Sequence, residues 1–207
     1  SDWRFKTHLA NLPIYYEYKE DGIDDTEAIK GTYLDNYKNL FDLYITDSTC
    51  DGAELSAKTA DDSRNEFVNG EAVFYQNGTW EYDALKKSIS DDDMQMIPIY
   101  CGVEGEEKAG LCSGTENCWA VNAKASKADQ KATLEFMKWL VTSEEGTKVM
   151  AEQFGAIPYK KAADSGNVFL KNANDLLEAG NYNVDWAFNY TPNVDEWRAS
   201  LVEAMNK

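Results

Sequence analysis

Metal-ligating residues and long apolar runs are scarce in this sequence. His8 is the only histidine among 207 residues, and the four cysteines, Cys50, Cys101, Cys112 and Cys118, show no CxxC spacing. Structural zinc sites need four closely arranged Cys and His ligands. No stretch approaches the roughly 20 apolar residues that cross a bilayer. We therefore expect neither a metal site nor a membrane-spanning helix.

Positive charge is also in short supply. The chain has 20 Lys and Arg against 37 Asp and Glu, for a formal net charge of -17. Binding to phosphate needs a basic patch, so neither nucleic acid nor an anionic membrane surface is an expected partner. Aromatic residues, in contrast, make up 13% of the chain, enough to build a core. The spacing of Cys112 and Cys118 allows a small disulfide loop, although cysteines also pack as buried apolar residues.

The pattern of apolar residues predicts an α/β fold, in which strands alternate with helices. Residues 3–18 are apolar without clean periodicity and indicate a strand or loop that feeds a helix. Strands are predicted at 71–77, 94–100 and 117–122, and helices at 25–46, 64–68, 127–141, 168–179 and 193–205. Ser126 is the expected cap of the helix at 127–141, and Thr142 with Glu145 has the pattern of a capping box for one more helix.

The strongest functional signal lies between Asn69 and Glu81. A short helix, a tight turn, a predicted strand and a glycine turn bring Trp80 to the carboxyl end of that strand. Ligands bind at this edge of open α/β sheets. A tryptophan offers a flat apolar face and a polar N–H, which suits the C–H faces and hydroxyl edges of sugars. Position alone leaves a core role for Trp80 equally open.

Five segments, in order, resemble the extracellular solute-binding proteins of ABC importers, in the carbohydrate-binding group that includes maltose-binding protein. They cover most of residues 60–207 and are FVNGEAVFYQNGTW (67–80), MIPI (96–99), AVNAKAS with the following helix and TSEEG (120–146), GAIP (155–158) and the closing helix (192–205). Each motif is weak alone, but their order and spacing agree with the family.

The resemblance implies a lobe of the periplasmic-binding-protein-like type II fold. Residues 1–115 would form the first part of the C-terminal lobe, residues 116–157 would cross to the N-terminal lobe, and residues 158–207 would close the C-terminal lobe. The matched elements belong to the second half of a two-lobed family chain. We therefore expect sequence upstream of Ser1, and weaker ligand binding by this chain than by a two-lobed protein.

The resemblance also implies a function. The protein would be a monomeric, extracytoplasmic substrate-binding component, lipid-anchored or periplasmic, that captures a sugar or oligosaccharide and delivers it to the ABC permease. It would use hinged closure and need no cofactor. Ligand-binding candidates are Trp80, Trp3, Glu116, Asn117, Trp119 and Trp197, the last with an equally open core role.

No residue is expected to be catalytic, but two other functions stay open. A glycan-active hydrolase needs two carboxyl groups flanking the scissile bond, and no motif places such a pair on adjacent strand ends. A cell-surface glycan-binding module is the second alternative.

Overall fold

The computed structural model describes residues 4–114, 118–154, 159–187, 191 and 193–205. The chain forms two units, which we describe separately. Unit 1 comprises Ser1–Asn77, Ile97–Gly114 and Ala179–Lys207, and unit 2 comprises Gly78–Met96 and Thr115–Glu178.

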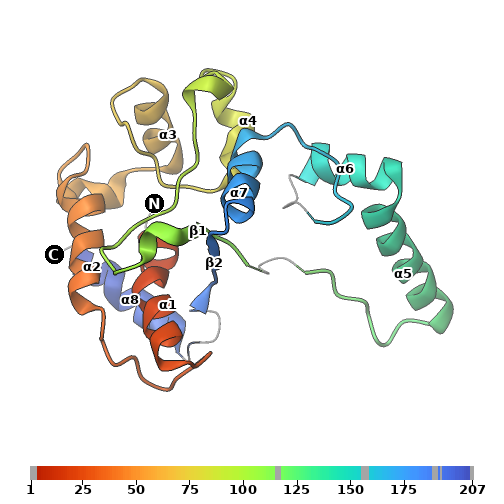
Figure 1. Cartoon of the computed structure of the whole chain (residues 1–207), viewed down its shortest axis with the longest axis horizontal. Helices are drawn as coiled ribbons and strands as arrows, with labels where there is room; N and C mark the ends of the chain where they lie inside the picture. Colours follow the sequence, from red (N-terminus) through yellow and green to blue (C-terminus); the bar gives the residue numbers. More distant parts are fainter. Residues whose placement is uncertain (1–3, 115–117, 155–158, 188–190, 192, 206–207) are drawn as a thin grey trace. The chain divides into compact units, whose positions relative to one another are not determined.

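Unit 1 consists of helices packed around a two-stranded parallel sheet (Figure 1). Its elements are η1 (Arg4–Leu9, a π-helix), α1 (Asn11–Asp21), α2 (Leu34–Phe41), η2 (Asp42–Thr46, a π-helix), η3 (Gly52–Ala57), α3 (Ala60–Val68), η6 (Glu106–Lys108), β1 (Ala109–Cys112), β2 (Tyr182–Val184) and α8 (Val194–Met205).

The sheet lies in the main apolar core of unit 1. Ala109 of β1 pairs with Tyr182 of β2, and Cys112 pairs with Val184. Ala109 and Val184 are fully buried, in one cluster with residues of η1, α1 and α2 that include Phe5, Leu12 and Leu40. The remaining strand side chains, Leu111, Cys112, Tyr182 and Asn183, are only half-buried, so helices cover part of this short parallel pair.

A buried carboxylate fixes the connection between α1 and α2. Glu17 is 2% exposed, and its two oxygens accept hydrogen bonds from the backbone N–H groups of Lys30, Gly31 and Thr32 at 2.7–2.9 Å. Gly31 has a positive φ of 79°, a region that favours glycine. Three charge-assisted bonds satisfy the buried acid and order the loop.

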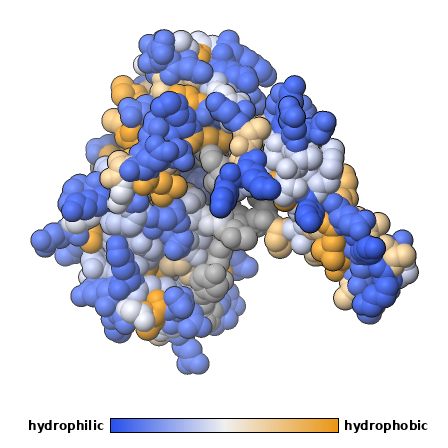
Figure 2. Space-filling view, turned by 45° about the vertical axis from the view of Figure 1, so that its right-hand side comes forward, coloured by the Kyte–Doolittle hydropathy of each residue, from blue (hydrophilic) through white to orange (hydrophobic). Residues whose placement is uncertain are grey.

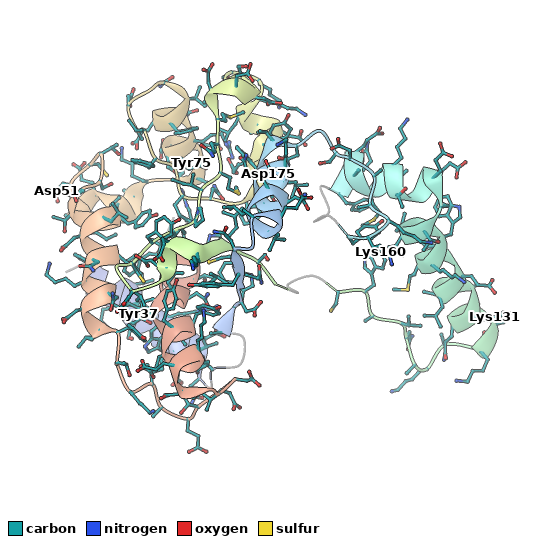
Figure 3. The ribbon with its side chains drawn as sticks, in the orientation of Figure 1. Tyr37, Asp51, Tyr75, Lys131, Lys160 and Asp175 are labelled. Atoms are coloured by element: carbon teal, nitrogen blue, oxygen red, sulfur yellow. The ribbon has the colours of Figure 1, made fainter. Side chains whose placement is uncertain are left out.

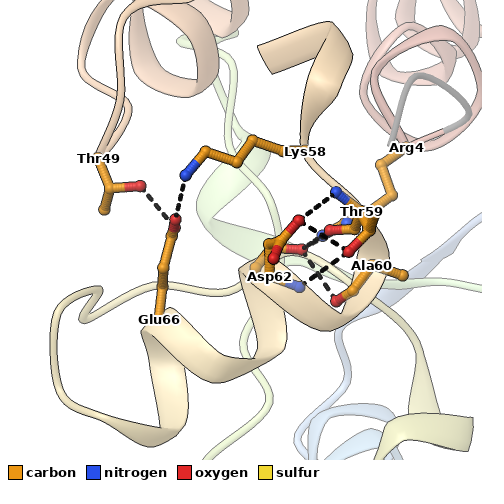
Figure 4. Close-up of polar contacts among 8 residues, drawn as sticks. Arg4, Thr49, Lys58, Thr59, Ala60, Asp62 and Glu66 are labelled. Carbon is orange, nitrogen blue, oxygen red and sulfur yellow. Dashed lines mark hydrogen bonds and ion pairs between the residues drawn. The ribbon is translucent and has the colours of Figure 1, made fainter. Parts of the chain in front are cut away.

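A capping box fixes the start of α3, four residues before the predicted start at residue 64. The Thr59 side chain accepts a hydrogen bond from the Asp62 N–H, and the Asp62 carboxylate accepts one from the Thr59 N–H, which forms a capping box (Figure 4). Further along α3, Glu66 accepts hydrogen bonds from Thr49 and Lys58. These contacts tie α3 to the preceding loop.

Unit 2 contains η4 (Thr79–Glu81), α4 (Tyr82–Leu85), η5 (Asp91–Asp93), α5 (Lys127–Thr142), α6 (Glu144–Phe154) and α7 (Val168–Glu178). Helices α5 and α6 pack closely at their junction. A Cβ added to Gly146 would lie 2.6 Å from the carbonyl oxygens of Trp139 and Leu140, so only glycine allows this approach.

Several of the predicted helices are confirmed, with adjusted boundaries. Ser126 caps α5, because its side chain accepts a hydrogen bond from the Asp129 N–H. Helices α7 and α8 lie at the predicted positions. The capping box predicted at Thr142 is wrong by one residue: Thr142 ends α5, and Ser143 accepts the hydrogen bond from Gly146 N–H that opens α6.

The predicted strands are wrong for the residues that the structure describes. Residues 71–77, 94–100 and 118–122 form no strand. Val73 and Phe74 are 81% and 76% exposed, so the segment 71–77 has no sheet neighbour that covers its apolar side chains. A β-rich sequence forms a strand only when a neighbouring strand supplies hydrogen bonds and burial.

Two predictions near the N-terminus also need correction. Residues 4–21 are helical rather than a strand or loop, and the helix predicted over 25–46 begins only at Leu34. The Glu17 carboxylate holds the backbone N–H groups of residues 30–32, which keeps this stretch as a loop. All four cysteines are free thiols, so no bridge joins Cys112 to Cys118.

Candidate functional site

Trp80 lies on a short turn that follows directly after Gly78. The turn η4 is closed by a hydrogen bond from the Glu81 N–H to the Gly78 carbonyl at 3.1 Å. The side chain of Trp80 is 58% exposed, whereas its neighbours Glu81 and Tyr82 are both 8% exposed. The turn therefore buries the residues that follow Trp80 and presents the indole at the surface of unit 2.

The turn is held in place by α7 and the loop before it. The Asn167 side-chain amide donates to the Thr79 carbonyl at 3.3 Å. The Tyr82 hydroxyl lies 2.9 Å from Asp91 Oδ2 and 3.0 Å from the Gly166 carbonyl, and can donate to either oxygen. Its ring meets Phe169 of α7 edge to face, with centroids 5.7 Å apart. These contacts hold the turn that carries the indole.

The protonation state of Tyr82 suits this supporting role. Burial, followed by the hydrogen bond to the Asp91 carboxylate, raises the pKa of Tyr82 above its ordinary value. The hydroxyl keeps its proton throughout the physiological range and remains a donor. The support beneath Trp80 is therefore insensitive to pH near neutrality.

The remaining candidate residues are divided between the two units and the residues that the structure does not describe. Trp119 is 52% exposed and belongs to unit 2. Trp197 lies in unit 1 on α8, where its half-buried ring meets Tyr37 edge to face at 6.1 Å and packs on the cluster that contains Ile14. This packing gives Trp197 a structural role. Trp3, Glu116 and Asn117 lie outside the described residues.

Tyr37 itself joins α2 to α1. Its hydroxyl donates to the Ala10 carbonyl at 3.0 Å, and Figure 3 labels the side chain among those between the two helices. Burial raises the pKa of Tyr37 far above its ordinary value. Trp197 therefore rests against a neutral, fixed tyrosine.

Sequence reasoning missed a buried polar cluster in unit 1. His8 Nδ1 lies 2.7 Å from the side-chain nitrogen of Gln76, and its ring is 5.3 Å from that of the buried Trp186. The Arg4 guanidinium donates to the Gln76 carbonyl at 3.3 Å and to the Ser63 hydroxyl at 2.7 Å. These residues are distant in sequence, and the local signal consists of three basic side chains, Arg4, Lys6 and His8, inside an apolar segment.

His8 is uncharged at neutral pH. Burial lowers the pKa of His8 to about 4, and the nearby positive charge of Arg4 acts in the same direction. Since the amide of Gln76 donates, Nδ1 is the accepting nitrogen and the proton sits on Nε2. A neutral imidazole in this position supports packing rather than proton transfer.

Helix α5 carries an exposed apolar face. Leu134, Phe136 and Trp139 are 56%, 58% and 44% exposed, and the rings of Phe136 and Trp139 stack at 5.9 Å. Figure 2 shows hydrophobic side chains along α5 beside a hydrophilic surface, and Figure 3 marks Lys131 on the same helix. Exposed apolar surface of this kind is typical of a contact region.

The described residues provide neither a metal-binding cluster nor a membrane-spanning helix. No group of three or more His, Cys, Asp or Glu among them has the arrangement needed to hold a metal ion. No helix in the described ranges has both the length and the apolar character of a membrane span.

Comparison with known families gives one match. The family described as bacterial extracellular solute-binding protein matches the chain over residues 1–178. Comparison with curated proteins finds no match. Comparison with solved structures finds none either.

Proposed function

Because this chain belongs to the bacterial extracellular solute-binding proteins, we propose that its ligand is a sugar or an oligosaccharide. The family consists of the extracytoplasmic solute-binding components of ABC transporters, so the partners are a solute and the transporter's permease. Proteins of this kind are typically not enzymes. The mixed, mainly helical structure with few strands is compatible with an α/β solute-binding fold.

The exposed indole of Trp80 carries the proposal of a sugar ligand. It is more than half exposed on a turn that Asn167 and Tyr82 hold from below. A fixed aromatic surface can stack on the apolar face of a pyranose ring at little entropic cost, because the indole is already ordered. Planar polar side chains would then meet the sugar hydroxyls.

We assign the other contacts from the family resemblance. Trp3 and Trp119 would add aromatic surface, and Glu116 and Asn117 would bind hydroxyl groups. Trp197 would support the fold through Tyr37, with a ligand contact as a second role. No cofactor and no catalytic residue are part of this proposal, and the protein would act as a monomer, either lipid-anchored or periplasmic.

The proposed domain division follows the type II fold. Residues 1–115 and 158–207 would belong to the C-terminal lobe, and residues 116–157 would cross to the N-terminal lobe. The exposed face of α5, with Leu134, Phe136 and Trp139, supports this division, because a lobe packed there would cover it. Closure of two lobes about the ligand would then signal the loaded state to the permease.

A matched pair of tryptophan variants tests the sugar proposal. Trp80→Ala and the control Trp139→Ala each remove one exposed indole. We expect Trp80→Ala to weaken binding of maltotriose, xylotriose or cellotriose by about 2 kcal/mol, as loss of an aromatic hot spot does, and Trp139→Ala to leave it unchanged. Titration calorimetry measures both.

Denaturation in urea separates this role from a core role. Truncation of a buried tryptophan costs about 3–5 kcal/mol of unfolding free energy, whereas an exposed one costs far less. A large loss of unfolding free energy in Trp80→Ala with unchanged sugar affinity would show that Trp80 has a core role. Release of reducing ends from any of the three sugars would instead favour the hydrolase alternative.

A further inference from the structure

Gly78 lies directly against the indole of Trp80. A Cβ added to Gly78 would be 2.2, 2.3 and 2.6 Å from Cζ3, Cη2 and Cε3 of that ring. These are consecutive atoms of the six-membered ring. An atom in the ring plane cannot approach three consecutive carbons so closely, so the added atom would lie over the ring face.

The backbone of Gly78 does not itself require glycine. Its φ of -123° and ψ of 175° are extended values that any residue adopts. The need for glycine at this position therefore comes from the ring and not from the turn. This separates Gly78 from glycines such as Gly31, whose positive φ would strain any side chain.

We propose that Gly78 is a positioning residue that sets the orientation of the Trp80 indole and so determines which ring face the ligand meets. This inference rests on the proposed role of Trp80 in sugar binding. The ring folds back over the Cα of Gly78, so backbone covers part of one face. The other face of the indole is then the one stacking face, and it suits one pyranose ring at a time. An arrangement in which the indole lies between two sugar rings is excluded.

Any side chain at position 78 would move the ring. Real Cβ atoms essentially never approach other atoms within 3.0 Å, and all three distances are shorter. The indole would have to rotate to a different rotamer, while the extended backbone of the turn could stay as it is. Gly78→Ala should therefore change the ring orientation without unfolding unit 2.

The test begins with the indole N–H signals in a ¹H–¹⁵N NMR spectrum of the 207-residue chain. The Trp80 signal is identified by its loss in Trp80→Ala. We expect Gly78→Ala to shift this signal, while the control Gly52→Ala, where the added Cβ makes an ordinary 3.4 Å contact with Ile45, leaves it in place. An unmoved Trp80 signal in Gly78→Ala would overturn the proposal whether or not any sugar binds.

A double-mutant cycle with maltotriose, xylotriose and cellotriose tests the consequence for binding. We expect Gly78→Ala to weaken binding about 10-fold or more in the wild-type background and by less than about 2-fold in Trp80→Ala, because the effect passes through the indole. Equal losses of sugar affinity in both backgrounds would contradict the claim that Gly78 acts through the indole. If none of the three sugars binds, the proposed function fails, and the indole signal alone still decides the orientation claim.

Discussion

The single histidine gives the protein a stability signature that can be measured without interference from another imidazole. His8 is 8% exposed and packs between Gln76 and Trp186. Its pKa falls from the ordinary 6.5 to about 4 on folding, chiefly because burial disfavours the charged form. Between these values the unfolded chain binds a proton that the native protein does not bind. Unfolding free energy should therefore fall as pH falls from 6.5 toward 4.

The size of the effect follows from the two pKa values. A full separation of about 2.5 units corresponds to about 3.4 kcal/mol, reached only below both values. From pH 7.5 to pH 5.5 the same linkage gives a loss of about 1.3 kcal/mol. A loss of this size is a substantial part of the stability of a typical domain. Carboxylates add their own dependence, so the contribution of His8 is the difference from a variant that cannot titrate there.

The assay compares wild-type protein with His8→Gln by urea unfolding at pH 7.5, 6.5 and 5.5. We expect the wild-type protein to lose about 1.3 kcal/mol more than the variant over this range. NMR titration of the one imidazole should give a native pKa well below 6. Parallel curves for the two proteins, or a native pKa near 6.5, would refute the buried neutral imidazole.

Two further predictions concern polar groups that hold loops. Thr59→Ala should lower the unfolding free energy by about 1 kcal/mol, because it removes the acceptor that caps α3, and no loss in urea unfolding would contradict the cap. Glu17→Gln should cost about 2 kcal/mol and speed hydrogen exchange at Lys30 and Thr32, since a neutral amide has only one acceptor oxygen for three donors. Unchanged exchange at both amides would show that the carboxylate does not order the loop.

The helices were predictable where the signal is local. Ser126 and its partner Asp129 lie three residues apart, and the cap of α5 needs nothing else from the fold. The error at Thr142 shows the limit of such local signals. Adjacent Thr and Ser residues can both cap a helix, and the length of α5 decides in favour of Ser143. Such details depend on packing and not on the motif.

The strands were not predictable from their composition. Residues 71–77 have a β-rich sequence but no adjacent strand in the described part of the chain. Strands β1 and β2 are short segments whose pairing joins residues more than 70 positions apart. Sheet formation depends on such distant partners, so a one-dimensional pattern cannot determine it. The helix predicted across residues 30–32 was wrong for a related reason. The carboxylate that orders this loop belongs to Glu17, which lies on another helix.

In the candidate site, too, local features were predictable and features that depend on distant residues were not. Trp80 and Gly78 are two residues apart, so the sequence could predict the turn at the tryptophan, whereas the choice between core and surface needed the structure. The cluster of Arg4, His8 and Gln76 joins residues about 70 positions apart, and no motif indicates it. The sequence could also not decide between core and ligand roles for Trp197, whose contact with Tyr37 depends on the packing of α8.

One NMR experiment tests the central claim, sugar capture without turnover, most directly. The ¹⁵N-labelled protein is titrated with maltotriose, xylotriose and cellotriose into the millimolar range, while the anomeric proton signals of each sugar are followed for a day. We predict a saturable shift of the Trp80 indole signal with at least one sugar and constant anomeric signals throughout. An unchanged Trp80 signal with all three sugars, or the appearance of new anomeric signals over time, would contradict the account.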